Sequence, residues 1–541
     1  MPIAALFITL VVQAALAQQL QPHILFNFTG DAGPIAPLTK GPDGNFYGTT
    51  QSGGSARLGN VFRLTPDGTM TTLVNFTGPN GHAPGIVPLT PDNMGNLCGT
   101  TIYGGSGGYG TVFKMTLDGS LTTLVNFNNS NGSAPEGLTL GNDGNLYGTT
   151  VTGTNYYGTV FKVTTDGAFS TLVNLVNSGS FPGNLTLYPD GSFYGGTYNG
   201  SSGYGTVFRV TTNGTLTMLV TLLGSSAPNS TALTLANDGN FYGTTLFGGS
   251  SGLGTVFRMT PQGRLTTLLN FNNNNGSLPA GPLTLGADGD LYGTTIYGGI
   301  FEGTVFKMKL DGTLTTLANF TSRSTGVRPY AGVTFGENGS LYGTTITGGS
   351  GDSGVIFRLD LSPTIITQPM SRTNASGTTA TFTVTASGTK PLSYQWLKDG
   401  TNLVDAGSIS GASTATLTWA NVQTSDAGDF SMVISNSSGS VTSTVAVLTV
   451  MVIDTDGDGV PDDQDQCPNT PPGAVVDERG CSIEQLVPCE GPRTGAMWKS
   501  HGEYVSALLT VVRDFLLQGA ITEEKAEEIV ATAGQSNCGK K

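Results

Sequence analysis

Basic residues, and charged residues in general, are scarce in this chain of 541 residues. Charged residues make up 11% of it, against about 25% in an average globular protein. Lys and Arg number 23 and Asp and Glu 37, which gives a formal net charge of −14. Nucleic acid is therefore not expected as a partner, because binding it requires a basic patch that displaces counterions. Residues 454–478 hold eight of the acids and no base, so the excess is largely local.

Histidine is also scarce, and this argues against an enzyme. The three His are His23, His82 and His501. The segments GGSGG 104–108 and GGSSG 248–252 match the G-x-S-x-G pattern, but neither is expected on a strand-to-helix elbow and no His is near them. The only Glu residues of the N-terminal two-thirds, Glu136, Glu302 and Glu337, form no recognisable constellation and are assigned no role. We predict no catalytic residues.

Long apolar runs are missing except at the start of the chain. Residues 3–17 are apolar and end in an Ala-Leu-Ala cleavage pattern before Gln18, so residues 1–17 are predicted to be a signal peptide. The segment lacks a basic region, so the true translation start is expected upstream. No transmembrane span is predicted in the mature chain. Four of the five Cys lie in the last 75 residues, which indicates an oxidising compartment and a secreted or cell-surface protein.

Glycine is abundant, at 80 residues, and this favours many short strands joined by tight turns over helices. Three motifs recur along residues 22–362. The first is LYGTT or FYGTT, with variants, marked by Tyr47, Cys98, Tyr147, Tyr194, Tyr242, Tyr292 and Tyr342. GTVF, with variants, follows each copy, and LVNF, with variants, follows the first six, while a further copy, LFNF 25–28, stands before any GTVF. Cys98 stands alone where the other units have Tyr, and is expected to be a buried thiol rather than a nucleophile.

Each repeat predicts four short strands joined by hairpins. Asp-Gly pairs such as Asp43-Gly44 and Asp67-Gly68 accept the positive φ that two-residue hairpin turns require. The array opens with a fourth strand at 23–28 and closes with a third strand at 354–359, so the first strand can complete the last sheet. This offset predicts a seven-bladed β-propeller over residues 22–362, because ring closure removes exposed sheet edges. The alternative is an open β-solenoid.

These motifs resemble the GloVer tandem repeat of exported bacterial proteins. The resemblance covers about 340 residues and implies a propeller-like fold and a surface location, with no established activity. The DGNLY segment also resembles the strand signal of gluconolactonase-type and streptogramin-lyase propellers, more weakly.

The loops between the second and third strands, and those between successive repeats, are expected on one face. Aromatic side chains beside amides and hydroxyls suit neutral sugars, so this face is predicted to bind a glycan or a surface protein. The alternative is a set of solubilising loops whose tyrosines pack on the sheet edge. The aromatic candidates are Tyr103, Tyr109, Tyr156, Tyr157, Tyr198, Tyr204, Phe247, Tyr297 and Phe301.

Residues 363–450 change to alternating Thr, Ser and Val. YQWLKDG 394–400 and DAGDF 426–430 resemble the I-set kind of immunoglobulin-like domain, with Trp396 as the core Trp. The usual Cys pair is missing, and Phe382 or Val384 together with Met432 are expected in its place. Phe430 stands where the tyrosine corner has Tyr. We expect a spacing or adhesion role.

DTDGDGVPDDQD 454–465 has the oxygen spacing of an EF-hand loop. The predicted Ca²⁺ ligands are Asp454, Asp456, Asp458, Val460 through its carbonyl, Asp462 and Asp465. Apolar helices do not flank the loop, so a calcium sensor is not expected. Residues 465–481 resemble the bacterial thrombospondin type 3 repeat, and for residues 453–482 this implies structural Ca²⁺ and a Cys467–Cys481 disulfide. The alternative is a disordered acidic linker.

The final module, residues 489–541, is predicted to contain helices at 497–517 and 522–533. Gly519 is expected to end the first and Thr522 to cap the second. Tyr504, Leu508, Val511 or Val512, and Phe515 form an apolar stripe, and Cys489 and Cys538 could link the hairpin.

The sequence therefore predicts a secreted or cell-surface binding or adhesion protein without enzymatic activity. The alternatives are a propeller enzyme of lyase or lactonase type acting on a surface polymer, and a purely structural surface component. The ligand, the anchoring mode and the oligomeric state are not specified by the sequence.

Overall fold

The computed structural model describes residues 19–30, 33–153, 157–176, 180–199, 205–222, 233–299, 302–462 and 464–540. The predicted signal peptide, residues 1–17, lies outside them. The chain is mainly β, with few helices, and divides into two compact units. The first covers residues up to 364 together with 386–392 and 436–439, and the second covers the rest.

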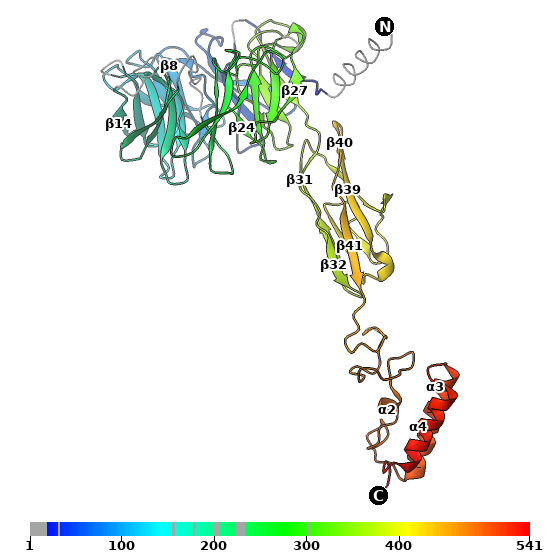
Figure 1. Cartoon of the computed structure of the whole chain (residues 1–541). Coiled ribbons are helices and arrows are strands. Elements are labelled where there is room, and N and C mark those ends of the chain that lie inside the picture. The colour runs from blue at the N-terminus through cyan, green and yellow to red at the C-terminus, as the bar shows by residue number, and fades with distance from the viewer. Residues whose placement is uncertain are drawn as a thin grey trace, which may run out of the picture. The chain divides into compact units, whose positions relative to one another are not determined.

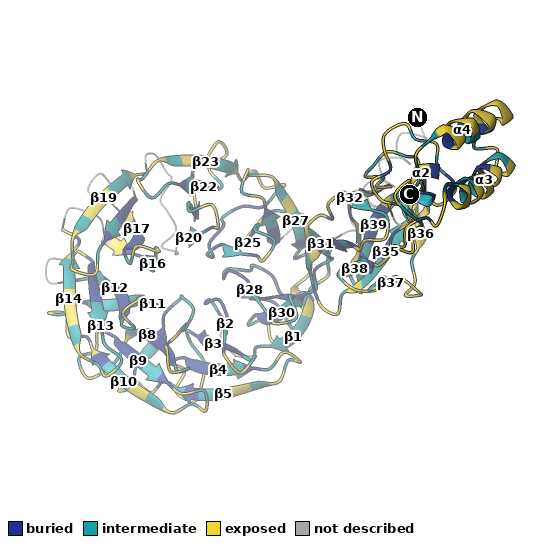
Figure 2. Ribbon diagram, turned by 90° about the horizontal axis from the view of Figure 1, so that it is seen from below, coloured by how far each residue is buried: buried dark blue, intermediate teal, exposed yellow. Residues whose placement is uncertain are grey.

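The first unit contains seven antiparallel sheets, one for each sequence repeat. In four of them the strands follow chain order from the centre outward (Figures 1 and 2). These are β2 (Thr39–Lys40), β3 (Phe46–Thr50), β4 (Asn60–Leu64) and β5 (Met70–Asn75); β11 (Ser133–Leu140), β12 (Leu146–Thr152), β13 (Thr159–Val163) and β14 (Phe169–Asn174); β20 (Thr234–Leu235), β21 (Phe241–Thr245), β22 (Thr255–Met259) and β23 (Leu265–Asn270); and β24 (Thr284–Leu285), β25 (Leu291–Thr295), β26 (Thr304–Met308) and β27 (Leu314–Asn319).

Two further sheets have an interrupted inner strand, and the seventh is completed from the other end of the array. The interrupted sheets are β6 (His82–Pro84), β7 (Thr90–Pro91), β8 (Leu97–Tyr103), β9 (Thr111–Met115) and β10 (Leu121–Asn126); and β15 (Ser180–Pro182), β16 (Thr186–Leu187), β17 (Phe193–Asn199), β18 (Thr206–Val210) and β19 (Leu216–Thr221). The seventh is β28 (Thr334–Phe335), β29 (Leu341–Thr344), β30 (Val355–Leu359) and β1 (His23–Asn27).

Strand β1 occupies the outer position that the fourth strand takes in every other sheet. It pairs antiparallel with β30, with Asn27 opposite Val355, and its register shifts between Ile24 and Phe26. The other six outer strands carry the same bulge, for example between Thr123 and Val125. The pairing predicted from the offset of the motifs is therefore present.

The seven sheets are arranged around a common centre with their short inner strands facing it (Figure 2). A Thr hydroxyl of each inner strand donates to a backbone carbonyl of the next sheet, and the seventh such bond, from Thr334 to Leu38, returns to the first sheet at 2.6 Å. The other six join Thr39 to Leu89, Thr90 to Leu138, Thr139 to Leu185, Thr186 to Leu233, Thr234 to Leu283 and Thr284 to Val333. Buried apolar clusters fill each space between sheets, and the cluster between the last and first sheets includes Phe28, Phe46 and Tyr342.

Most of an immunoglobulin-like sandwich falls in the second unit. Its strands are β31 (Thr364–Thr367), β32 (Arg372–Ala375), β33 (Ala380–Thr383), β34 (Thr385–Ser387), β35 (Ser393–Lys398), β36 (Thr401–Asn402), β37 (Ile409–Ser410), β38 (Thr416–Trp419), β39 (Gly428–Asn436), β40 (Gly439–Thr442) and β41 (Ala446–Met451). Trp396 is fully buried and its indole N–H donates to the Thr414 carbonyl at 3.0 Å. Phe382 stacks on Phe430 at 4.7 Å and Met432 is buried, so apolar packing occupies the core where the Cys pair is missing.

The C-terminal part contains a short helix α2 (Ile483–Leu486), which the sequence did not predict, and the pair α3 (His501–Leu517) and α4 (Glu523–Gln535). The predicted start of α3 at 497 is wrong by four residues, because the Ser500 hydroxyl caps the helix at Glu503. Thr522 caps α4 as expected. Tyr504, Leu508, Val512 and Phe515 are buried together, so the apolar stripe forms this module's own core.

Candidate functional site

Two kinds of loop meet at one end of the seven-sheet array, as the sequence predicted. In two of the sheets, the described parts of the loop that enters the sheet and of the loop between its second and third strands are hydrogen-bonded to each other. Gly105 N donates to Gly78 O at 2.8 Å, and Gly299 N donates to Asn273 O at 2.6 Å. The opposite end carries tight turns in which glycine takes a positive φ, such as Gly68 at +98°. We call the first end the loop face.

The loop face carries exposed aromatic side chains, with 36% to 55% of each accessible. Each ring is about half covered, so both the binding face and the alternative of tyrosines packed on the sheet edge stay open at this point. Of the other predicted members, Tyr156, Tyr204 and Phe301 lie outside the described residues. The exposed aromatic residues are Tyr103, Tyr109, Tyr157, Tyr198, Phe247 and Tyr297.

Polar groups accompany two of these aromatic rings. The His82 and Tyr103 rings have centroids 5.6 Å apart. The Arg328 guanidinium lies 5.2 Å from the centroid of Tyr297 and forms an ion pair with Glu302 at 3.0 Å. Exposed ring faces beside hydrogen-bonding groups can stack on a sugar ring or on a peptide side chain.

At the opposite end, a repeated polar contact anchors the second strand of the sheets. Tyr47 donates to Asp43 at 2.8 Å, and Tyr147, Tyr242 and Tyr292 do the same with the Asp of their own turns. Burial, followed by the hydrogen bond to Asp43 and its charge, raises the pKa of Tyr47 to about 12. Because the contact recurs at equivalent positions, it stabilises the repeat rather than marking one site.

Cys98 interrupts this series and is fully buried as a free thiol. Burial, followed by the charge of Asp92, raises the pKa of Cys98 to about 12. The thiol is therefore protonated at neutral pH and is a poor nucleophile. Lys114, on the neighbouring strand β9, donates from its ammonium group to the Thr165 carbonyl of the next sheet at 2.8 Å.

In the acidic loop the structure brings together three of the six predicted calcium ligands. One carboxylate oxygen each from Asp454, Asp456 and Asp458 lies within 4.8 Å of the others. Asp462 faces Thr455 instead, whose hydroxyl and backbone N–H lower the pKa of that carboxyl. No contact of the Val460 carbonyl places it with the three carboxylates among the described residues.

A further carboxylate, Asp465, lies near the edge of this cluster. A Cβ at Gly480, where φ is +77°, would collide with Asp465 Oδ1 and lie 3.1 Å from Asp458 Oδ2. Asp458 Oδ2 is shielded from solvent and has no hydrogen-bond partner in the part of the chain that the structure describes. The donors are therefore all hard oxygens, the type that Ca²⁺ prefers.

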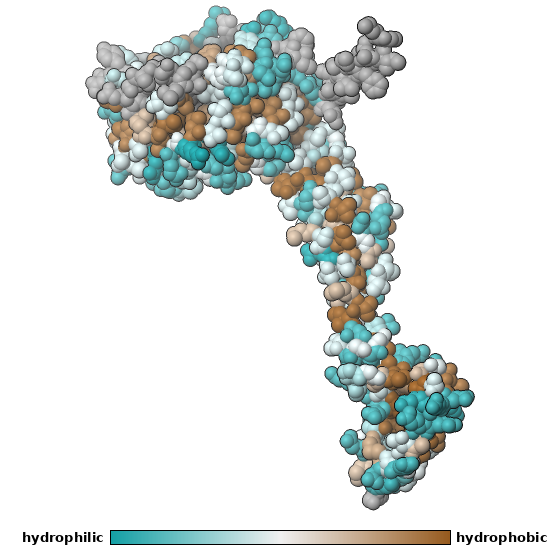
Figure 3. Space-filling view, in the orientation of Figure 1, coloured by the Kyte–Doolittle hydropathy of each residue, from teal (hydrophilic) through white to brown (hydrophobic). Residues whose placement is uncertain are grey.

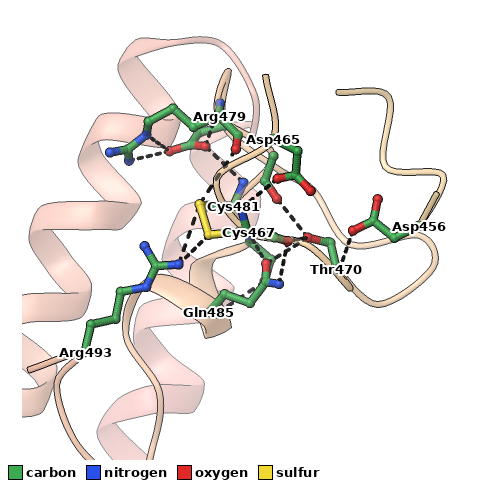
Figure 4. Close-up of a disulfide and its surroundings, with 11 residues drawn as sticks. Asp456, Asp465, Cys467, Thr470, Arg479, Cys481, Gln485 and Arg493 are labelled. Carbon is green, nitrogen blue, oxygen red and sulfur yellow. Dashed lines mark hydrogen bonds and ion pairs between the residues drawn. A yellow bond between two sulfur atoms is a disulfide. The ribbon is translucent and has the colours of Figure 1, made fainter. Parts of the chain in front are cut away.

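The Cys467–Cys481 disulfide joins the acidic loop to the segment after it (Figure 4). Thr470 contacts the Cys467 and Gly480 carbonyls through its hydroxyl, and its backbone N–H donates to Asp456 at 2.6 Å. Arg493 lies against the disulfide sulfurs. No sequence pattern pointed to Arg493, because only the folded chain brings it to the disulfide.

A second disulfide, Cys489–Cys538, ties the start of the C-terminal module to its end. Asp477, which lies outside the predicted set of ligands, is buried beside Arg479. Although burial acts to raise its pKa, hydrogen bonds from Arg479 and from the Cys481 N–H hold the pKa of Asp477 below its usual range. The sequence feature that could have indicated this role is its position two residues before the Arg479-Gly480 pair, which is typical of a turn.

Among the described residues, no helix has the length and apolar character needed to cross a membrane. Apolar side chains are nevertheless exposed along the sandwich, and brown patches mark it in Figure 3. They include Met370, Val445, Val447 and Met451.

Comparisons with known proteins identify both kinds of domain. The Gloeobacter/Verrucomicrobia repeat model matches residues 11–200 and 181–401, and the immunoglobulin I-set model matches residues 363–450. No curated protein matches the chain.

Solved structures that match include titin domain M4, with 26% identity over 17% of this chain and 99% of that chain and a TM-score of 0.16. The titin I-band fragment I67–I69 is 32% identical over 16% of this chain and 32% of that one, with a TM-score of 0.16. Tandem Ig repeats of Dlar are 19% identical over 21% and 75% of the two chains, with a TM-score of 0.17.

The repeat and immunoglobulin-type domains point to a structural or binding protein of surface or adhesion type rather than an enzyme. The disulfides and the immunoglobulin-like domain are consistent with an extracellular protein. Because the repeat model spans well over half of its length, the chain belongs to the Gloeobacter/Verrucomicrobia repeat family.

Proposed function

We propose that the first unit is a seven-bladed β-propeller spanning residues 22–362. The seven sheets, the seven Thr-to-carbonyl bonds and the pairing of β1 with β30 support this fold. The proposed modules that follow are an immunoglobulin-like domain at 363–450, a thrombospondin type 3-like repeat at 453–482 and a helical module at 489–541. The proposed signal peptide, residues 1–17, would direct the chain to the secreted or cell-surface location.

The function that the geometry supports best is recognition at a surface through the loop face. The observation that carries it is the set of six exposed aromatic side chains gathered on the loops of one end. Rigid sheets position these rings, and ring faces at fixed spacing stack on sugar rings at little cost in conformational entropy. The ligand class is a neutral glycan, or a glycosylated surface protein that presents one.

A glycan array probed with the full chain and with two matched variants tests this proposal. The first variant combines Tyr103→Ala, Phe247→Ala and Tyr297→Ala. The control combines Met94→Ala and Met218→Ala, two exposed residues outside these loops. We expect binding to neutral oligosaccharides that the triple variant loses and the control keeps. Equal signals from both variants, or no glycan bound by the unmodified chain, would contradict it.

The acidic loop is proposed to hold structural Ca²⁺ through Asp454, Asp456 and Asp458, with Asp465 at the edge of the site. The residues fit the ion because three carboxylates converge and Asp458 Oδ2 is shielded without a partner. Clustered carboxylates repel one another unless a cation lies between them. Ca²⁺ would therefore stiffen the segment between the sandwich and the helical module.

Calorimetric titration with Ca²⁺ and proteolysis with and without chelator test the calcium proposal. Asp456→Asn should weaken Ca²⁺ binding and expose residues 454–465 to protease. Glu478→Gln is the control, because Glu478 is an exposed acid of the same segment. Equal protease resistance of the wild type with and without chelator would argue against a calcium site.

A further inference from the structure

A cavity of about 330 Å³, here called the seam cavity, lies where the last sheet of the array meets the first (Figure 2). Strand β1 contributes Phe26 to its wall, and β4 and β5 of the first sheet contribute Asn60 and Met70. Arg57 lines it from the loop between β3 and β4. Its volume falls in the range of about 300–1,000 Å³ typical of small-molecule sites, and none of its described lining residues is an acid.

The residues of the seam cavity depart from the repeat at four positions. Phe26 stands where the outer strands of the other six sheets have Val, Leu or Ala, and Met70 stands where those of the second to sixth sheets have Leu or Phe. Asn60 replaces the Thr that the third strands of five other repeats carry in GTVF. Arg57 has a φ of +57° at a position where the matching loops of two other repeats have glycine, and a bulky residue at positive φ is uncommon. These departures coincide at one place in an otherwise regular array.

With Asn60 in place of Thr, the first sheet lacks a hydrogen bond that five other sheets share. In those sheets the Thr hydroxyls that face each other across the second and third strands are hydrogen-bonded at 2.7–2.9 Å, as Thr101 and Thr111 are at 2.9 Å. In the first sheet Asn60 faces Thr50. Thr50 Oγ1 and Asn60 Oδ1 are both shielded and have no hydrogen-bond partner among the described residues. An unpaired buried polar group destabilises a fold, and such local inconsistencies are expected at functional sites.

The polar side chains at the seam cavity offer mainly hydrogen-bond donors. The Arg57 side chain is exposed and forms no ion pair or hydrogen bond with a described residue. The Asn60 amide NH₂ likewise has no described partner, and Thr29 and Thr72 add hydroxyl groups to the wall. Guanidinium and amide N–H groups are planar donors that suit a carboxylate. The Phe26 ring supplies an apolar surface beside them.

We propose that the seam cavity binds a hexuronate, a pyranose sugar that carries a carboxylate. Arg57 holds the carboxylate, and the Asn60 amide and the two Thr hydroxyls bond to the ring hydroxyls. The Phe26 ring contacts the C–H face of the sugar. A neutral sugar lacks the group that Arg57 requires, and an apolar acid lacks the hydroxyls. The inference does not depend on the proposed function of the loop face, because none of the six exposed aromatic residues lines this cavity.

Calorimetric titration of the full chain with three probes tests this proposal: sodium D-glucuronate, D-glucose and sodium cyclohexanecarboxylate. We expect glucuronate to bind at least about tenfold more tightly than either of the others, because only glucuronate carries both the carboxylate and the hydroxyls. Arg57→Gly gives the loop the residue found in two other repeats, so it should keep the fold and weaken glucuronate binding by about tenfold or more. Arg264→Gln, which changes an exposed Arg that does not line the cavity, should leave the affinity unchanged.

Asn60→Thr separates binding from stability. The new hydroxyl can pair with Thr50 as in the other sheets, so the thermal transition of the array should stay at the wild-type temperature or rise. Glucuronate binding should nevertheless fall by about fivefold or more, because the amide donor is lost and the new hydroxyl is engaged by Thr50. A purely structural role of Asn60 would leave binding unchanged.

The combined Tyr103→Ala, Phe247→Ala and Tyr297→Ala variant locates the site, and it should bind glucuronate like the wild type. Loss of glucuronate binding in that variant would place the sugar on the loop face and overturn this inference, while the proposal for the loop face would stand. The inference is also overturned if the wild type binds no glucuronate, if the three probes bind equally, or if Arg57→Gly or Asn60→Thr binds glucuronate like the wild type.

Discussion

The bond from Thr334 to Leu38 joins the last sheet of the array to the first, and its removal tests whether the array closes. The Thr334 hydroxyl donates to the Leu38 carbonyl at 2.6 Å, across 296 residues of sequence. Thr334→Val preserves the side-chain shape and removes the donor. The carbonyl then loses a partner in a shielded place, which costs about 1–3 kcal/mol.

Thr90→Val is the matched control, because Thr90 makes the same 2.6 Å bond to Leu138 between two sheets that are consecutive in sequence. In an open array the Thr334 substitution would leave the stability of the array unchanged, and only the Thr90 substitution would lower it. In the proposed propeller both should destabilise the array by a similar amount.

Hydrogen–deuterium exchange resolved by peptide measures this effect. A loss of about 1–3 kcal/mol accelerates exchange of protected amides by about 5- to 150-fold, and we expect this in β1 and β30 for Thr334→Val. Tryptophan fluorescence serves as an internal control, since Trp396, Trp419 and Trp498 all lie outside the array. Unchanged exchange at β1 in Thr334→Val, with faster exchange in Thr90→Val, would refute the closure.

Three further predictions follow from the described contacts. Because burial raises the Glu136 pKa from 4.5 to about 7, the native state binds more protons than the unfolded chain between these values, and stability falls as pH rises through them. The free energy of unfolding of Glu136→Gln should therefore exceed that of the wild type by up to about 3 kcal/mol at pH 8 and equal it at pH 4. Hydrogen exchange of β11 amides at matched pH measures this difference. Cys98→Tyr should restore the hydrogen bond to the turn Asp and stabilise the array by about 1 kcal/mol in calorimetric scans, and a lower transition temperature would contradict this. Replacing Cys489 and Cys538 by Ser should destabilise the helical module by about 4 kcal/mol, because the crosslink closes a long loop; unchanged protease resistance of α3 and α4 would contradict it.

The sheets were predictable because their signals are local. Asp43-Gly44 and its equivalents specify hairpin turns within a few residues, and the recurring GTVF and LVNF motifs mark the strands that these turns join. The joining of β1 to β30 is long-range, yet it was predictable from the offset between the first and last motifs. Because the motifs repeat, the missing fourth strand of the last repeat and the extra one before the first repeat can both be recognised in the sequence, and together they predict the long-range pairing of β1 with β30.

The electrostatic effect of Glu136 on Tyr330 and the details of the acidic loop were not predictable in this way. Glu136 and Tyr330 come from different repeats, and each looks unremarkable in its own repeat, so no local pattern indicates that the charge of Glu136 raises the pKa of the Tyr330 hydroxyl. In the acidic loop, the EF-hand spacing assigned Asp462 to the ion, but the Thr455 hydroxyl and N–H compete for that carboxylate. Local hydrogen bonds of this kind depend on turn geometry, which ligand spacing does not encode.

The position of β1 in the seventh sheet has a consequence for biosynthesis. The first strand to leave the ribosome pairs with a strand that is made about 330 residues later, which at about 5–20 residues per second is roughly 20 to 60 s. Until β30 is made, the backbone donors and acceptors of β1 that pair with it have no partner in the array. A chain truncated before Val355 could not satisfy them, so the seventh sheet is completed only when nearly the whole array has been synthesised.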